Sequence, residues 1–373
     1  MQKASKIYLD HVSTSAIDEE VLATYTRLLK DYYNSDALYE DGVTVYRNQE
    51  KSRTLIAEML GVKYEEIIFT SGASEANNLV IKGLSLLHQG GHIISSSYEH
   101  SSVDEALKQV AKYLGIKVTY LDPKKDGRID PLDVRNALRD DTFLVTIMMV
   151  NNEIGAINDI SAIHKVIKDN AKALFHSDMT QALGKCEICL KDVDMASFSA
   201  HKIHGVKGSG FLYKRKHIEI APLISAGQQE FHLRGGTSNS PANIVLAKTI
   251  RKALEERETY GSYMQDLHSY ALEQLAKIPN VTINSPKDGV FGLINISTPV
   301  KTEVMINALD LHGIMVSGKS TCGSREDEPS HTLKAMHIDS EYALRISFDH
   351  TMTKEKIDIF IKYLKETIDR YAR

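Results

Sequence analysis

The stretch Ser197-Phe-Ser-Ala-His-Lys-Ile-His-Gly205 decides the fold that this sequence predicts. It continues an apolar, strand-like run that starts at Asp194, and it passes directly into His201 and Lys202. A lysine at a strand end, among small and polar residues, loses its proton more easily when it is buried, and the neutral amine can form a Schiff base. Taken alone, the stretch fits a surface lysine after a strand better.

Asp178, 24 residues before Lys202, supplies the second half of the pattern. It follows another apolar run, residues 173–177, and leads into Met179-Thr-Gln181. A Schiff-base lysine and a strand-end aspartate are the pair that pyridoxal 5'-phosphate (PLP) requires, because the carboxylate keeps the pyridine nitrogen protonated and the ring can then accept electrons. The two residues together predict a PLP enzyme.

Four motifs of this chain are similar to those of the cysteine desulfurases, a family of class V, fold-type-I PLP enzymes. They follow in the family's order and cover nearly the whole chain, so the resemblance implies this fold, PLP as the cofactor, and conversion of L-cysteine to L-alanine. The four motifs are Thr70-Ser-Gly-Ala-Ser-Glu-Ala-Asn-Asn78, Val150-Asn-Asn-Glu-Ile-Gly155, Ser177-Asp-Met-Thr-Gln181 and Ser197-Phe-Ser-Ala-His-Lys202.

Composition bounds the partners and the location of the protein. Its 373 residues suit two or three domains, and 42% hydrophobic residues suit a globular core. A net charge of −4 gives no positive electrostatic field that would attract nucleic acid or a membrane surface. The first residues form no hydrophobic signal region, and no apolar run approaches the roughly 18 residues that span a bilayer. Three cysteines cannot all pair, so we expect a reducing cytoplasm.

Strand-like and helical segments alternate from residue 66 to residue 213, after a capping box at Ser15-Ala-Ile-Asp18 that predicts a first helix. The strands are apolar throughout rather than alternating, which indicates burial on both faces of a mostly parallel sheet, here of seven strands. An α+β pattern follows a long helix that begins at Ser240-Pro241. We therefore expect an α/β large domain, residues 15–258, and a smaller α+β domain, residues 1–14 and 259–373.

The start of the helix after Gly72 suits a phosphate, because free amide groups and the helix dipole favour an anion there, although a plain N-cap explains the pattern as well. The resemblance implies further roles. His100 stacks on the pyridine ring and carries protons, and Thr237 reaches the cofactor of a second subunit, which implies a homodimer. The cofactor contacts implied in this way are Ala73, Ser74, His100, Asn152, Asp178, Gln181, Ser199, His201, Lys202 and Thr237.

The substrate contacts are likewise implied by the resemblance. Arg345 matches the arginine that takes the substrate carboxylate, a task for which a guanidinium offers a bidentate contact. An arginine in the polar register of a strand is the alternative. Asn34 and Asn152 are the other expected substrate contacts.

Cys322 lies in Val316-Ser-Gly-Lys-Ser-Thr-Cys-Gly-Ser-Arg-Glu-Asp-Glu-Pro-Ser330, a polar, glycine- and serine-rich stretch that predicts a mobile loop. A free cysteine is usually buried, so one in such a loop suggests a reactive thiol. By resemblance, Lys202, His100 and Cys322 are the catalytic residues, and Cys322 takes the substrate sulfur as a persulfide. The stretch has the length of the family's long-loop subgroup, which implies direct delivery to an acceptor protein, either an iron–sulfur scaffold or a thiolation enzyme.

Cys186 and Cys189 form a single Cys-Glu-Ile-Cys pair. Without a second pair or nearby histidines, this is a poor zinc site, and we expect no metal. Packing is the simpler explanation for both cysteines.

The chain departs from the family at four places, which we expect to lie at or near the substrate side. They are His11-Val-Ser13, residues 34–39 up to Tyr39, His204, and Asp349-His350. These departures leave alternatives open: a selenocysteine lyase or an aminotransferase of the same fold, or a PLP-binding assembly subunit that has lost its activity.

Overall fold

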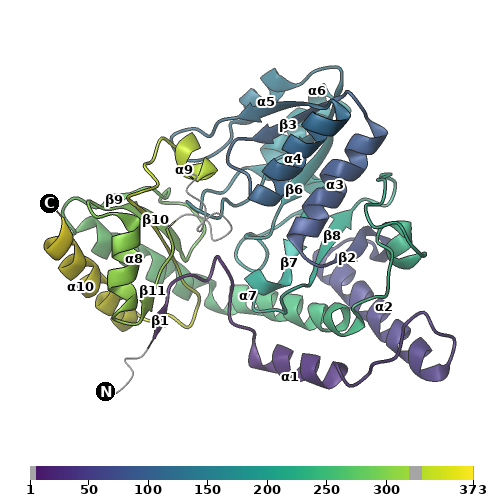
Figure 1. The fold of residues 1–373 in the computed structure, drawn as a ribbon, viewed down its shortest axis with the longest axis horizontal. Coiled ribbons are helices and arrows are strands. Elements are labelled where there is room, and N and C mark those ends of the chain that lie inside the picture. Colours follow the sequence, from purple (N-terminus) through teal and green to yellow (C-terminus); the bar gives the residue numbers. More distant parts are fainter. Residues whose placement is uncertain (1–5, 319–329, 373) are drawn as a thin grey trace.

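A seven-stranded sheet forms the centre of the larger part of the molecule (Figure 1). The computed structural model describes residues 6–318 and 330–372. Strand β8 is antiparallel to both of its neighbours, and the other strands pair in parallel, as the sequence predicted. In spatial order the strands are β2 (Ile67–Thr70), β8 (Gly210–Lys214), β7 (Met195–Ser199), β6 (Leu174–Asp178), β5 (Thr142–Thr146), β3 (His92–Ser96) and β4 (Lys117–Leu121).

Helices cover both faces of this sheet, and successive strand residues enter opposite cores. Ile67 and Phe69 of β2 belong to one buried cluster, whereas Ile68 belongs to the other. This two-sided burial explains the continuous apolar runs in the sequence. One face is covered by α3 (Ala73–Leu87) and α4 (Ser101–Leu114), and the other by α2 (Glu40–Leu60), α5 (Pro131–Ala137), α6 (Ile160–Asn170) and the first half of α7 (Ser240–Ala276).

The smaller part is built on a three-stranded antiparallel sheet with a separate apolar core. Helices α8 (Thr302–Asp310) and α10 (Lys354–Tyr371) contribute to this core, and α9 (His331–Ala335) lies between the two parts (Figure 1). Its strands are β12 (Ala343–Ser347), β10 (Leu293–Ser297) and β9 (Thr282–Ile283), and β1 (Ile7–Tyr8) pairs in parallel with β11 (Ile314–Met315) beside them.

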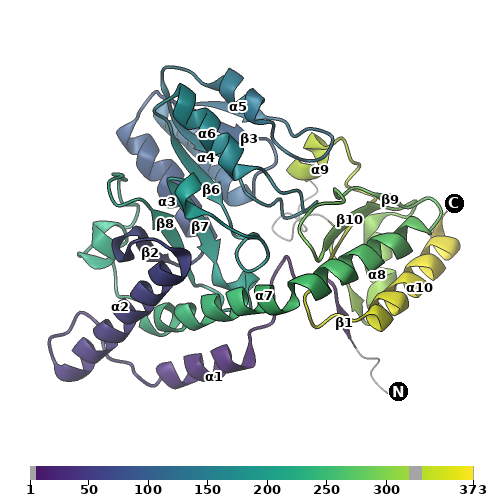
Figure 2. The same ribbon diagram turned by 180° about the vertical axis from the view of Figure 1, so that it is seen from behind.

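Helix α7 runs along both parts (Figure 2) and divides its buried residues between them. Leu246 and Ala253 pack into the large core, whereas Leu267 and Leu275 pack into the small one. We propose on this basis that the domain boundary lies within α7, near residue 258 as the sequence predicts. The pairing of β1 with β11 likewise supports placing the N-terminal residues in the small domain.

The first helix does not begin at the predicted capping box. Helix α1 (Glu19–Leu28) starts three residues later, with Asp18 as its N-cap in place of Ser15 and the Asp18 carboxylate accepting from the Val21 amide at 3.0 Å. Ser15 instead donates its hydroxyl to the His201 carbonyl at 3.0 Å. The predicted pattern was wrong because a tertiary contact to the segment around Lys202 takes the serine that local geometry would use as a cap.

A buried ion pair anchors the segment that precedes α7. Arg53 of α2 donates to both carboxylate oxygens of Glu230, at 2.6 and 2.9 Å, and the Phe69 amide donates to the same carboxylate at 2.7 Å. Glu230, Phe231 and His232 all have positive φ angles, of 49°, 55° and 66°. Because such a run of left-handed residues is strained, the Arg53–Glu230 pair must hold it in place.

Arg53→Met should leave the Glu230 carboxylate buried without its cation, at a cost of about 3–5 kcal/mol in the free energy of unfolding. Chemical denaturation of the two proteins measures the loss. Lys216→Met, which breaks an exposed ion pair with Glu65, is the control and should leave stability unchanged within error. Equal losses in both variants would show that burial of the Arg53–Glu230 pair contributes nothing to the free energy of unfolding.

Candidate active site

A cavity of about 310 Å³ lies where β6 and β7 end. Ligands bind at this edge in open α/β sheets, because the loops that leave the strands converge there. The cavity brings together most of the residues that the sequence predicted, from positions far apart in the chain. Those that line it are Ala73, Ser74, His100, Asn152, Asp178, Gln181, Ser199, His201, Lys202 and Arg345.

Asp178 is the last residue of β6, and its buried carboxylate is held in a fixed orientation. One oxygen accepts from the Asn77 side-chain amide of α3 at 2.8 Å, and the other accepts from the Thr180 backbone amide at 2.9 Å. Both partners are neutral groups. A protonated pyridine nitrogen is a cationic partner of the kind that this carboxylate would take.

Lys202 ends the short helix η3 (Ala200–Lys202) that follows β7. Its Nζ donates to the backbone carbonyls of Val12 and Ser13, at 2.7 Å in each case. Carbonyl oxygens only accept hydrogen bonds, so the amine rests against the N-terminal segment, which forms one wall of the cavity.

The first turn of α3 forms the end of the cavity that suits a phosphate. Gly72, the N-cap, has a φ of 143° and provides no side-chain cap, and a Cβ at this position would lie 2.9 Å from the Ser199 Oγ. The Ala73 amide donates to that same Oγ at 2.8 Å, and Ser74 adds a hydroxyl. Backbone amides, hydroxyls and the positive end of a helix dipole suit a dianion. Together with Asp178 and Lys202, these donors fit PLP.

His201 and Gln181 complete this wall with neutral groups. Burial, with the charges of Lys202 and Lys207, lowers the pKa of His201 to about 4, so the ring is neutral at neutral pH. Its Nδ1 lies 3.2 Å from the Thr14 hydroxyl. The Gln181 side-chain amide donates to the Val12 carbonyl at 3.2 Å.

Arg345 of β12 enters the cavity from the smaller part of the molecule, with only 1% of the residue exposed. Its guanidinium donates to the Asp10 carboxylate at 3.0 Å, to the Ser13 hydroxyl at 2.6 Å and to the Asn152 carbonyl at 3.0 Å. Its Nε has no hydrogen-bond partner among the residues that the structure describes. A guanidinium that lines this cavity is suited to a carboxylate ligand.

Two of the predicted site residues that the structure describes, Asn34 and Thr237, do not line the cavity. Asn34 is exposed, and its side-chain oxygen accepts from the Asp36 amide at 2.9 Å in a surface turn. Thr237 is exposed just before α7. Cys322 lies outside the described residues. The roles of all three stay predictions.

The two cysteines that the structure describes differ in burial. Burial raises the pKa of Cys186 to about 11, so its thiol keeps its proton at neutral pH. Cys189 is exposed and unpaired by a disulfide. Within residues 6–318 and 330–372 no group of three potential ligands could hold a metal ion, and no helix is both long and apolar enough to cross a bilayer.

Several residues that shape the cavity escaped the sequence analysis. Asn77 sits in a motif that was recognised, but its contact with Asp178 depends on how α3 packs against β6. Val12 contributes through its backbone carbonyl, which no side-chain pattern reveals. Lys185 lies in a turn four residues after Gln181, and its Nζ donates to the Gln181 side-chain oxygen at 2.6 Å. This contact fixes the orientation of the Gln181 amide, because it leaves the NH₂ group on the side of Val12.

The chain matches the family model for class V aminotransferases over residues 7–360. It is 36% identical to cysteine desulfurase IscS of Dictyoglomus turgidum, over 98% of this chain and 95% of that protein. It is 35% identical to cysteine desulfurase IscS of Methanosarcina thermophila, over 98% of this chain and 92% of that protein.

Solved structures agree in fold. A NifS-like protein superposes with a TM-score of 0.92 at 32% identity, covering 98% of this chain and all of that one. The structure described as SspA in complex with cysteine superposes with a TM-score of 0.79 at 30% identity, covering 92% and 99% of the two chains.

Lys185→Met should remove a pH dependence of stability. Burial, with the nearby Lys202 charge, lowers the pKa of Lys185 to about 8, whereas an unfolded lysine titrates near 10.4. Between these values the unfolded chain binds more protons, so the wild type gains stability relative to the variant as pH rises. Thermal unfolding across this range measures the gain.

Lys108→Met is the matched control, because hydrogen bonds from its Nζ to Asp104 and Glu105 raise the pKa of Lys108. Both the folded and the unfolded protein keep that proton through most of the same range. If the stability of both variants relative to the wild type changed with pH in the same way, the result would contradict the burial of the Lys185 charge.

Proposed function

This chain belongs to the class V aminotransferase family and, within it, to the cysteine desulfurases, and from that membership we propose that it converts L-cysteine to L-alanine and retains the sulfur on Cys322. One observation carries the proposal. The ends of β6 and β7 and the strand β12 bring Asp178, Lys202 and Arg345 into one cavity. The pair that PLP requires therefore lies in the same cavity as the guanidinium of Arg345.

Four groups would hold the cofactor. Asp178 would accept from the pyridine nitrogen, the first turn of α3 and Ser199 would bind the phosphate, and Lys202 would hold the aldehyde carbon. When bound, PLP supplies a ring that accepts electrons from the carbon next to the substrate nitrogen. The Gln181 NH₂ group, which Lys185 orients, would donate a hydrogen bond to an oxygen of the cofactor.

The chain's own residues account for orientation and proton transfer. Arg345 would bind the substrate carboxylate and so fix the position of the α-carbon. Lys202, as a neutral amine, would remove the α-proton, and the carbonyls of Val12 and Ser13 would accept hydrogen bonds from the resulting ammonium. His100 lines the same cavity and would carry protons there.

The sulfur step needs a nucleophile, and Cys322 is the proposed one. Its thiolate would form a bond to the substrate sulfur while the bond between that sulfur and the β-carbon breaks. The carbon fragment would take up a proton and leave as alanine, and the enzyme would keep one sulfur as a persulfide. We propose that a second protein, an iron–sulfur scaffold or a thiolation enzyme, then accepts this sulfur. Because persulfide transfer needs free thiols, we place the protein in the reducing cytoplasm.

Cys322→Ser should retain PLP and bind cysteine but release neither alanine nor sulfide, because no thiolate takes the sulfur. After one turnover of the wild type without reductant, mass spectrometry should find about 32 Da added to the peptide that contains Cys322, the mark of a covalent nucleophile. Replacement of Cys186 and Cys189 by alanine is the control and should leave the addition in place. Normal turnover by Cys322→Ser would overturn the assignment, and so would sulfur found only on Cys186 or Cys189.

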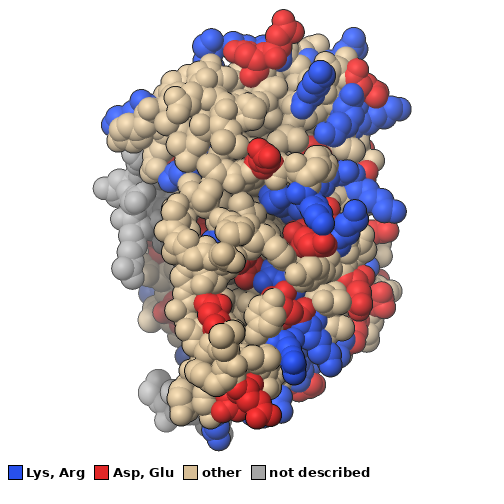
Figure 3. All heavy atoms as spheres, turned by 90° about the vertical axis from the view of Figure 1, so that its right-hand side faces the viewer, with Lys and Arg blue, Asp and Glu red and all other residues tan. Residues whose placement is uncertain are grey.

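We also propose a homodimer in which Thr237 completes the partner's site. Large apolar side chains are exposed around the start of α2, among them Tyr32 at 83% and Leu38 at 96% exposed. Large apolar side chains that are exposed close together suggest an interface. Figure 3 shows this side of the molecule, where residues other than Lys, Arg, Asp and Glu predominate at the left and centre and charged residues are densest toward the right-hand edge.

Mixing two inactive variants tests whether Thr237 of one subunit acts in the active site of the other. A dimer of one Lys202→Ala subunit and one Thr237→Ala subunit contains one site with both residues intact, so activity should rise above the sum of the separate variants. Mixing Lys202→Ala with Arg345→Ala is the control. Both of those residues line one cavity of one chain, so this mixture should gain nothing. No gain in the first mixture would show that Thr237 acts within its own subunit or not at all.

A further inference from the structure

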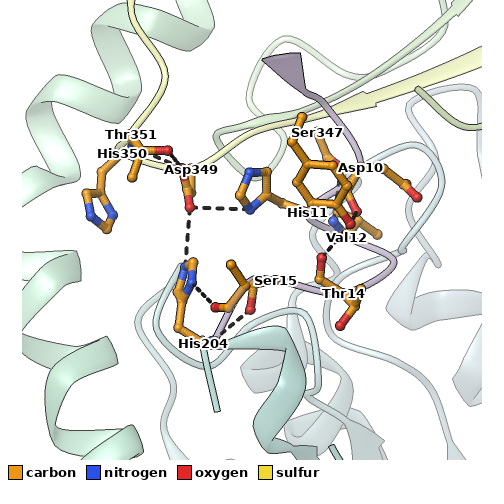
Figure 4. A network of polar contacts seen from close by, with 12 residues as sticks. Asp10, His11, Val12, Thr14, Ser15, His204, Ser347, Asp349, His350 and Thr351 are labelled. Atoms are coloured by element: carbon orange, nitrogen blue, oxygen red, sulfur yellow. Dashed lines mark hydrogen bonds and ion pairs between the residues drawn. The ribbon is translucent and has the colours of Figure 1, made fainter. Parts of the chain in front are cut away.

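Three of the residues at which the chain departs from its family lie outside the active-site cavity. His11, His204 and Asp349 lie close together (Figure 4) and line a separate cavity of about 40 Å³. The expectation that they lie at or near the substrate side was wrong, because none of the three lines the 310 Å³ cavity. Polar contacts that bear on the larger cavity itself join Asp178 and His100, two residues of its wall.

A continuous chain of hydrogen bonds connects Asp178 of β6 to His100, which precedes α4. The side-chain amide of Asn77, in α3, donates to Asp178 Oδ2 at 2.8 Å and to the Ser102 hydroxyl at 2.9 Å. The Ser102 Oγ in turn lies 2.9 Å from His100 Nδ1. The two outer members of the chain line the cavity, and the two inner members, Asn77 and Ser102, do not.

The chemistry of Asn77 and Asp178 fixes the direction of the first two bonds. A carboxylate only accepts and an amide NH₂ group only donates, so both hydrogens of the Asn77 NH₂ group are used, one on Asp178 and one on Ser102. Asn77 is fully buried, and its Oδ1 has no hydrogen-bond partner within residues 6–318 and 330–372. The opposite orientation of the amide would place this oxygen against the carboxylate, so the NH₂ group stays on Asp178.

The direction of the last bond follows from the start of α4. His100 is the N-cap of this helix, and its Nδ1 accepts from the Ser102 backbone amide at 3.1 Å. A backbone amide only donates, so Nδ1 is an acceptor and the single proton of the neutral ring lies on Nε2. The Ser102 hydroxyl accepts from Asn77 and has its own proton left for the same Nδ1. Both donors of Ser102 therefore converge on one ring nitrogen.

We propose that Ser102 and Asn77 are positioning residues for His100, which hold its ring proton on Nε2 and link the ring to the Asp178 carboxylate. The proposal rests on the proposed function, in which His100 carries protons in the cavity. The two nitrogens of an imidazole are distinct, and the hydrogen bonds made by one decide the role of the other. Because Nδ1 is committed to the end of α4, Nε2 is the nitrogen that takes up and releases protons.

The same chain reaches the carboxylate that would accept from the pyridine nitrogen. Asn77 supplies one of the two donors that orient Asp178, and the Thr180 amide supplies the other. Hydrogen bonds in a chain polarise one another, so a cation bound at Asp178 and the ring of His100 act on each other through Asn77 and Ser102. We therefore expect the loss of Asn77 to affect both the binding of PLP and the state of the His100 ring.

Ser102→Ala in the PLP-loaded enzyme should lower kcat about three- to tenfold, the usual worth of one hydrogen bond, with little change in KM for cysteine, because Arg345 still binds the substrate. Ser101→Ala is the matched control, since it removes the hydroxyl one residue earlier in the same turn of α4 and Ser101 does not line the cavity. It should leave kcat unchanged.

Nitrogen NMR of the protein labelled with ¹⁵N-histidine gives a readout that does not depend on activity. At alkaline pH, where a histidine ring carries one proton, the wild type should show His100 with Nδ1 unprotonated and Nε2 protonated. His100→Gln identifies the two signals by their absence. In Ser102→Ala the Nδ1 signal should move toward that of a nitrogen with fewer donors, and in Ser101→Ala it should stay in place.

Asn77→Leu, which is close in size, breaks the chain at its centre. It should weaken the binding of PLP to the apoprotein about three- to tenfold, measured by absorbance titration, because Asp178 loses a donor. The effect of Ser102→Ala on kcat should be smaller in the Asn77→Leu background than in the wild type, because members of one hydrogen-bond network are coupled. If Asn77→Leu does not fold, the nitrogen spectrum of Ser102→Ala still tests the proposal.

Three results would overturn the positioning role. They are a wild type with the His100 ring proton on Nδ1, a Ser102→Ala variant with unchanged ring signals, and additive effects of the two substitutions on kcat. A wild type that forms no alanine would refute the proposed function, whereas the nitrogen spectrum and the affinity for PLP would still decide the roles of Ser102 and Asn77.

Discussion

The buried guanidinium of Arg345 ties together three parts of the chain that are distant in sequence. It comes from β12, binds Asp10 and Ser13 of the N-terminal segment, and donates to the carbonyl of Asn152 beyond β5. A buried cation is tolerated only where acceptors surround it, so these contacts require that the two parts of the molecule close around it. The active-site cavity exists because they do.

The parallel sheet supplies the other side of this arrangement. Because β6 and β7 run in the same direction and pair directly, their last residues, Asp178 and Ser199, arrive at the same edge. The residues that follow these two strand ends therefore lie close together. The short helix after β7 directs Lys202 across this edge to the N-terminal segment, where two carbonyls receive its amine. The lysine therefore links the large sheet to a segment that pairs with the small part through β1.

The residues at which this chain departs from its family form a connected group rather than scattered changes. His11, His204 and Asp349 contact one another, and each faces the side of Lys202 away from the candidate substrate pocket. The Oδ2 atom of Asp349 lies 3.3 Å from His11 Nδ1 and 3.5 Å from His204 Nε2.

The sequence by itself determined the succession of strands and helices along the chain, the mostly parallel sheet, and the positions of Asp178 and Lys202 at strand ends, because apolar runs and strand-end residues are local signals. It also indicated Arg345, and the structure places that residue in the predicted cavity. Only the tertiary structure decided that Ser15 serves the Lys202 turn instead of capping α1, that backbone carbonyls of Val12 and Ser13 receive the amine, and that Lys185 orients Gln181. Each of these contacts joins residues through main-chain atoms or through the packing of distant segments. The geometry of such contacts depends on how whole elements are placed, which no local pattern of side chains encodes.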